Sequence, residues 1–78
     1  MSTSVVERTP LASDVTCTRD ELIVTLVDGR RISVPLAWFP RLSKASESEL
    51  RNYELLGDGE GIHWPDIDED LSVEGLLR

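Results

Sequence analysis

The stretch that decides the fold is LIVTLVDGRRISVPL, residues 22–36. Apolar residues occupy every second position on both sides of Asp28-Gly29, which is typical of two strands that each bury one face. These residues are Leu22, Val24 and Leu26 before the turn, and Ile32, Val34 and Leu36 after it. Asp-Gly favours a two-residue type I′ turn, because both turn residues need positive φ. The stretch therefore predicts an antiparallel hairpin, and Pro35, which lacks an N–H, should end its strand or lie at a sheet edge.

The residues before this hairpin predict one further strand. Residues 15–20 alternate with period two and are rich in β-branched side chains, so they complete a three-stranded meander. Residues 1–13 show no periodicity and predict a flexible N-terminal arm. The folded domain should therefore span residues 14–78.

Short elements are predicted after the meander. The spacing of apolar residues becomes helical, which with Pro40 predicts a short helix or 3₁₀ turn over residues 40–44. Ser46 and Glu49 match a capping box and predict a helix over 47–52. The remaining predicted elements are strands at 53–56 and 61–64 around a glycine-rich turn, an acidic loop after Pro65, and a helical turn at 73–77 capped by Ser72. The expected fold is α+β: a small antiparallel β-meander of three strands, a short helical segment, a returning β-hairpin and a short C-terminal helical turn.

Composition excludes several classes of protein. With 78 residues, 40% of them hydrophobic, the chain fits a single small domain. Cys17 is the only cysteine and His63 the only histidine, which excludes an internal disulfide and a four-ligand Cys/His zinc site. The N-terminus lacks the pattern of a secretory signal, and no apolar run reaches the roughly 18–20 residues that span a bilayer. We therefore expect a cytoplasmic protein without a membrane association.

The net charge of −7 is unevenly distributed. Residues 58–78 hold seven of the fifteen acidic residues and one of the eight basic residues. This segment would repel phosphate backbones, so direct nucleic-acid binding is not expected. It would attract a small basic protein or a hard cation.

The acidic positions resemble part of a calcium loop. Asp66, Asp68 and Asp70 alternate as the first three ligands of such a loop do. The loop also needs Gly at its sixth position and Glu at its twelfth, where this chain has Leu71 and Leu77. We predict no metal ligands and no cofactor, and the alternatives left open are a weak divalent-cation site, a solvated loop and an acidic docking surface.

His63 could act as a general base, because its unperturbed pKa lies near neutrality. No Ser or Cys stands beside it at a motif spacing, so we expect an outward-facing strand residue and predict no catalytic residues. Cys17 alternates with Val15 and is expected to be a small core residue.

The four aromatic residues have two interpretations. Trp38, Phe39, Tyr53 and Trp64 are expected to form the small core. In the alternative, Trp38 or Trp64 is partly exposed and anchors a partner, as tryptophan often does at interface hot spots.

Two segments in this order resemble a known family: LVDGRRISVPLAWFPRL, residues 26–42, and GIHWPDIDEDLSVEGLL, residues 61–77. The chain is similar over residues 14–77 to a small bacterial family, domain of unknown function 2442. The resemblance implies an α+β domain with a meander, a helical segment and a returning hairpin. It also implies a partner, because members are often encoded beside another small uncharacterised protein in a pair regarded as a toxin–antitoxin module, with this domain as the antitoxin.

The favoured hypothesis is a non-enzymatic interaction domain that docks a small basic protein, with Trp38 or Trp64 as the apolar anchor. The residues expected to carry the charge are Asp66, Asp68, Glu69, Asp70 and Glu74. One alternative is a self-associating structural domain with an exposed edge strand near Pro35. A less favoured alternative is a cation-binding or hydrolytic domain around His63 and residues 66–70.

Overall fold

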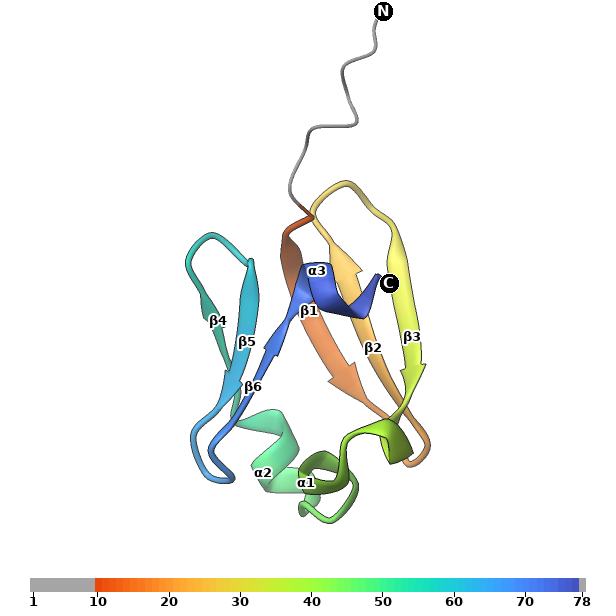
Figure 1. Cartoon of the computed structure of the whole chain (residues 1–78), viewed down its shortest axis with the longest axis vertical. Helices are drawn as coiled ribbons and strands as arrows, with labels where there is room; N and C mark the ends of the chain where they lie inside the picture. The colour runs from red at the N-terminus through yellow and green to blue at the C-terminus, as the bar shows by residue number, and fades with distance from the viewer. Residues whose placement is uncertain (1–9, 78) are drawn as a thin grey trace, which may run out of the picture.

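The computed structural model describes residues 10–77, which form two antiparallel three-stranded sheets joined by short helices (Figure 1). The first sheet has the order β1-β2-β3, with strands β1 (Ala12–Cys17), β2 (Glu21–Leu26) and β3 (Arg31–Pro35). The second sheet has the order β4-β5-β6, with strands β4 (Glu54–Leu56), β5 (Gly61–Trp64) and β6 (Glu69–Ser72). The predicted α+β class and the predicted meander are confirmed, and Pro35 ends an edge strand as expected.

The helices are short and connect the sheets. The first three are η2 (Leu36–Trp38), α1 (Pro40–Ser43) and α2 (Glu47–Arg51). They lie together at one end of the molecule, and α3 (Val73–Leu76) follows β6 (Figure 1). The predicted capping box is present, since Ser46 N–H donates to the Glu49 carboxylate at 2.9 Å and Glu49 N–H donates to Ser46 Oγ at 3.2 Å. Within residues 10–77, no helix is long and apolar enough to cross a membrane.

The first strand begins earlier than predicted. It runs over residues 12–17 instead of 15–20, and Thr18 forms the following turn, where its Oγ1 accepts the N–H of Glu21 at 2.9 Å. Ala12 is 2% exposed, and its N–H donates to the carbonyl of Gly59 at 2.7 Å. This contact with a distant turn holds the start of β1 at Ala12, two residues before the predicted start of the domain at residue 14. Residues 1–9 of the predicted arm lie outside the described residues.

The Asp28-Gly29 turn is a different type from the one predicted. Gly29 has a φ of 96°, whereas Asp28 does not have a positive φ. Leu26 N–H donates to the Arg30 carbonyl at 2.7 Å and Gly29 N–H donates to the Leu26 carbonyl at 2.9 Å, which leaves three residues in the loop. Such loops combine a turn with one left-handed residue. The Asp28 carboxylate also accepts the N–H of Arg30 at 3.0 Å, a local bond that favours this loop over the type I′ turn.

The predicted acidic loop after Pro65 is largely a strand. Glu69–Ser72 forms β6 and pairs with β5 in the register Trp64↔Glu69, His63↔Asp70 and Ile62↔Leu71. The returning hairpin is therefore extended to a three-stranded sheet. Only Leu71 in β6 is apolar, so the sequence of this strand shows no alternation that would predict it.

One core lies between the inner faces of the two sheets. The buried apolar residues are Ala12, Val15, Leu22, Val24, Leu26, Val34, Leu36, Leu42, Ile62, Trp64 and Val73. Polar contacts also join the sheets: Tyr53 Oη accepts the N–H of Val15 at 3.2 Å and donates to Asp14 at the same distance. The position of β4, β5 and β6 beside the meander is thereby fixed.

Candidate functional site

The turn between β5 and β6 carries two of the predicted acidic residues. We call residues 65–68 the acidic turn; the pairing of Trp64 with Glu69 closes it. The Asp66 carboxylate accepts the side-chain N–H of Asn52 at 3.0 Å. Asp68 has a φ of 52°, a left-handed conformation that Asp tolerates better than most residues. The acidic turn is therefore an ordered hairpin turn with exposed carboxylates.

Arg41 of α1 reaches this turn from a distant part of the chain. Its Nη1 donates to the carbonyl of Asp68 at 2.7 Å and lies 4.0 Å from the carboxylate of Glu69. The Glu69 side chain is only 20% exposed, whereas that of Arg41 is 61% exposed. Glu69 is thus the inner, partly neutralised member of the predicted acidic set. Sequence analysis missed Arg41, since nothing in its local pattern links α1 to β6.

The predicted acidic residues do not share one surface. Side chains alternate between the two faces along β6. Asp70 therefore stands on the outer face of the second sheet, beside its cross-strand partner His63, and Glu69 stands on the inner face. Glu74 lies in the first turn of α3, beyond the opposite end of β6 from the acidic turn (Figure 1). Asp66 and Asp68 lie in the acidic turn and Asp70 in the adjoining strand, whereas Glu74 is separated from them.

His63 lies between carboxylates on the outer face of the second sheet. It pairs in register with Glu54 of β4 and Asp70 of β6, and its Nδ1 is hydrogen-bonded to the Asp70 carboxylate. The bond to Asp70 is the main cause that raises the pKa of His63 above its usual value, and the charges of Asp70, Glu54 and Asp68 act in the same direction. The expected outward-facing position of His63 is confirmed. Within residues 10–77, no three His, Cys, Asp or Glu side chains are grouped so that they could hold a metal ion.

The two tryptophans have opposite environments. Trp64 is 0% exposed and its Nε1–H donates to the carbonyl of Leu50 at 3.1 Å, so it belongs to the core and is not available as a surface anchor. Trp38 is 65% exposed, more than any other large hydrophobic residue that the structure describes. The anchor hypothesis is therefore restricted to Trp38.

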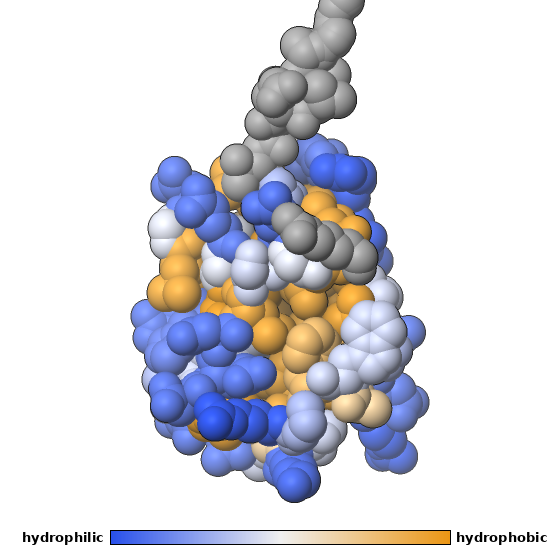
Figure 2. Space-filling model, in the orientation of Figure 1, coloured by the Kyte–Doolittle hydropathy of each residue, from blue (hydrophilic) through white to orange (hydrophobic). Residues whose placement is uncertain are grey.

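Trp38 and the acidic turn adjoin the same short helix. Trp38 ends η2, Pro40 begins α1, and Arg41 of that helix contacts the acidic turn. Figure 2 shows that apolar side chains also reach the surface in the middle of this view of the molecule, with polar side chains around them. An exposed apolar ring and the acidic turn thus adjoin the same short helical segment.

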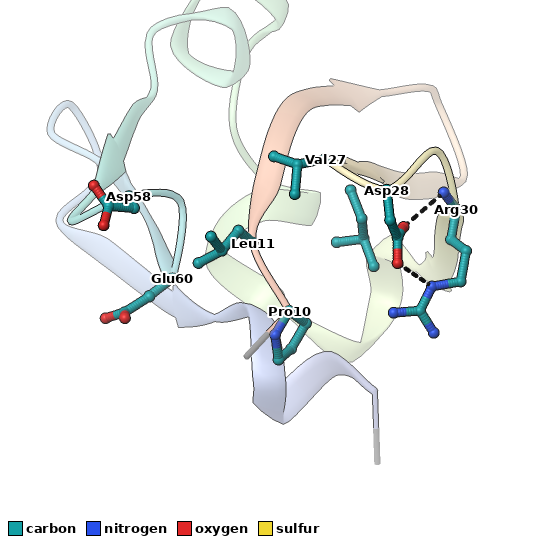
Figure 3. Close-up of a pocket in the computed structure, with 8 residues that line it drawn as sticks. Pro10, Leu11, Val27, Asp28, Arg30, Asp58 and Glu60 are labelled. Atoms are coloured by element: carbon teal, nitrogen blue, oxygen red, sulfur yellow. Dashed lines mark hydrogen bonds and ion pairs between the residues drawn. The ribbon is translucent and has the colours of Figure 1, made fainter. Parts of the chain in front are cut away.

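One pocket of about 330 Å³ lies at the other end of the molecule, between the β2–β3 loop and the β4–β5 turn (Figure 3). The residues that line it are Pro10, Leu11, Leu26, Val27, Asp28, Arg30, Asp58 and Glu60. Asp28 is paired with Arg30 at 2.8 Å, and the carboxylates of Asp58 and Glu60 point away from Leu11 and Val27 (Figure 3). The polar groups of the pocket do not converge on a common point. The pocket is therefore an apolar recess, and its lining indicates no catalytic or ligand-binding role.

Two more recesses, of about 510 and 400 Å³, share Cys17, Glu47 and Leu50 in their walls. Cys17 packs against the core, as expected, and burial raises the pKa of its thiol. A raised pKa keeps the thiol protonated near neutral pH, and the protonated thiol is a poor nucleophile. These recesses therefore offer no activated nucleophile.

Comparisons with known proteins match the chain to a protein family and to a solved structure. A family model described as "Protein of unknown function (DUF2442)" matches residues 12–78. A crystal structure of a protein of unknown function from Rhodospirillum rubrum ATCC 11170 is similar, with 35% sequence identity and a TM-score of 0.77. The match covers 90% of this chain and 87% of that one. No curated protein matches the sequence.

Proposed function

The chain belongs to the DUF2442 family of proteins of unknown function, and on that premise we propose that it is a non-enzymatic, cytoplasmic protein-interaction domain for a small basic partner. The observation that carries this proposal is the exposure of Trp38. A tryptophan that is 65% exposed leaves a large apolar surface in water, although the same small domain buries Trp64 completely. Tryptophan is enriched at the centres of protein interfaces, where burial of its ring contributes much of the affinity.

The charge of the neighbouring surface supports a basic partner. Asp66, Asp68 and Asp70 are exposed, and the segment from residue 58 onward holds seven acidic residues against one basic residue. Arg41 already donates to the main-chain carbonyl of Asp68, which indicates that a guanidinium group is well accommodated there. Lys or Arg side chains of a partner would add to this arrangement through the exposed carboxylates.

The proposal is tested with a charge-neutralised variant that preserves the shape of the turn. In the triple variant Asp66→Asn, Asp68→Asn and Asp70→Asn, Asn can still accept the bond from Asn52 and tolerates the left-handed conformation at position 68. The matched control neutralises three exposed carboxylates outside this segment: Asp20→Asn, Glu21→Gln and Glu47→Gln. Both variants lose the same amount of charge.

The measurement is a parallel capture from lysate of the source organism with tagged wild type, triple variant and control, eluted by a salt gradient. We expect wild type and control to retain a small basic protein that elutes at moderate salt, and the triple variant to release it earlier. A Trp38→Ser variant should also lose it. Equal retention by all four proteins would reject the acidic turn and Trp38 as the docking surface.

We further propose that the partner is a toxin and that this domain is its antitoxin. This part rests on the resemblance to a family regarded as one half of toxin–antitoxin pairs. The captured partner, expressed alone, should arrest growth, and co-expression of the wild-type domain should restore it. Restoration should be weaker with the triple variant. A partner that has no effect on growth would reject the antitoxin role and leave the docking surface intact.

A second candidate function is self-association through the same exposed Trp38 and the open edge of β3. An unpaired strand edge is a ready template for another strand. The net charge of −7 opposes this association. Light scattering on the purified protein distinguishes the two candidate functions. A stable dimer that Trp38→Ser dissociates would favour self-association. A monomer would favour docking of a different protein.

A further inference from the structure

Strand pairing builds a row of three titratable side chains across the second sheet. His63 on the central strand β5 lies in register with Glu54 on β4 and with Asp70 on β6. The two carboxylates are sixteen positions apart in the sequence and are brought to either side of the imidazole by the sheet alone. All three side chains stand on the outer face, opposite the face that buries Ile62 and Trp64.

The contacts of His63 depend on its charge. Its Nδ1 is hydrogen-bonded to the Asp70 carboxylate, and its side chain is 25% exposed. The groups that face it are Glu54 from β4, Asp70 from β6 and Asp68 from the acidic turn, and all three are carboxylates. Among residues 10–77, no Lys or Arg is a cause of the shift in its pKa. A protonated imidazole is thus attracted from both neighbouring strands, whereas a neutral one retains only a hydrogen bond.

The strands on either side of β5 are short. β4 has three residues and β6 has four, and both are edge strands, so few main-chain hydrogen bonds hold them to the centre. β6 is also the element that joins the acidic turn to α3. An attraction that spans all three strands therefore adds to strand pairings that are shorter than those of the first sheet.

We propose that His63 is a pH-responsive clasp of the second sheet, which holds β4 and β6 to β5 when protonated and loosens them when neutral. The inference shares Asp70 with the proposed docking surface, but it needs no partner and is tested on the isolated protein. The pKa of His63 is raised in the folded protein relative to the ordinary value of 6.5. The folded state therefore binds the proton more tightly than the unfolded state. The added stability is complete below about pH 6.5 and is lost as the pH rises through the folded pKa.

The direct test is an NMR titration of the imidazole, which is unambiguous because His63 is the only histidine. We expect a pKa above 6.5 in the wild type, a large decrease in Asp70→Asn and a smaller one in Glu54→Gln. Amide resonances of β4 and β6 should titrate with the same midpoint as the imidazole in the wild type. A wild-type pKa at or below 6.5, or a pKa that Asp70→Asn leaves unchanged, would overturn the proposal.

A stability measurement tests the consequence for the fold. The melting temperature Tm of the wild type should decrease between pH 5.5 and 8.5 relative to that of His63→Gln, which keeps a polar side chain but cannot titrate there. All other titratable groups are the same in both proteins, so the difference between the two curves isolates His63. A flat difference would contradict the clasp. If His63→Gln does not fold, the imidazole titration and the amide shifts of the wild type and Asp70→Asn still test whether His63 acts as the clasp.

Discussion

Gly59 lies in the turn between β4 and β5, where this turn contacts the first strand of the other sheet. Its φ is +109°, and a Cβ at this position would lie 2.9 Å from the amide nitrogen of Ala12 and closer still to its carbonyl oxygen. The carbonyl of Gly59 itself accepts the N–H of Ala12 at 2.7 Å. Only glycine combines this backbone conformation with so close an approach.

We therefore expect Gly59→Ala to be among the most destabilising single substitutions in the chain. Backbone strain alone costs about 1–3 kcal/mol, and the steric conflict with Ala12 adds to it. A small domain has on the order of 3–5 kcal/mol of net stability, so the variant should be largely unfolded near room temperature. Urea unfolding followed by tryptophan fluorescence measures the change.

Gly29→Ala is the matched control for this substitution. Gly29 has a similar φ of +96°, but a Cβ there would meet nothing within 4 Å. Its cost should be limited to the strain of the left-handed conformation, about 1–2 kcal/mol. If both variants lost the same free energy of unfolding, the close approach of Gly59 to Ala12 would not be a determinant of stability.

Among the elements, α2 depends most on local capping. It has five residues, none of them fully buried, and Leu50 is the one apolar residue that it packs against the core. Ser46 and Glu49 cap each other reciprocally at its N-terminus, and Arg51 lies 3.4 Å from Glu47 along its exposed side. Exposed i,i+4 ion pairs of this kind contribute only about 0.3–0.5 kcal/mol, so the cap is the larger effect.

Ser46→Ala should lower the free energy of unfolding by about 1 kcal/mol, because the N–H of Glu49 loses its acceptor. Ser46→Asp provides another acceptor and should restore most of the loss. Thermal unfolding by circular dichroism would measure both variants. Equal stability of Ser46→Ala and the wild type would show that α2 is held by its connections to α1 and β4, with no contribution from the cap.

The same elements show what the sequence could predict. Strands β2 and β3 were predictable because Leu22, Val24 and Leu26 alternate, and α2 because a capping box is a local motif. β6 was not, since it contains one apolar residue and is held by its pairing with β5. The start of β1 was missed for a similar reason: its first residue is fixed by Gly59, far along the chain.

At the scale of the whole molecule, the arrangement of the two sheets was not predictable. Contacts such as Val15 with Tyr53 and Arg41 with Asp68 join residues that are distant in sequence and carry no local signal. The candidate site was predictable in part. Its acidic residues are evident from the sequence. Trp38 and Trp64, however, each stand within two residues of an aliphatic residue and of a proline, and only the fold distinguishes the exposed ring from the buried one.

The net charge of −7 on a domain of this size has its own consequence for stability. Like charges repel more in the compact state than in the extended chain, so the folded protein is destabilised by its own charge. Salt shortens the range of this repulsion from about 30 Å at 0.01 M to about 8 Å at 0.15 M. We expect Tm to increase between 10 and 300 mM NaCl, by roughly 2–4 °C if the screened repulsion is worth about 0.5 kcal/mol.

The double variant Asp58→Asn, Glu60→Gln removes two exposed charges from the acidic segment and should show a smaller increase in Tm. The same salt should weaken the proposed docking of a basic partner, because the attraction between the two proteins is screened as well. Stability and binding are thus expected to respond to salt in opposite directions. A Tm that decreases with added NaCl in the wild type would mean that ion pairs such as Arg41 with Glu69 outweigh the self-repulsion of the chain.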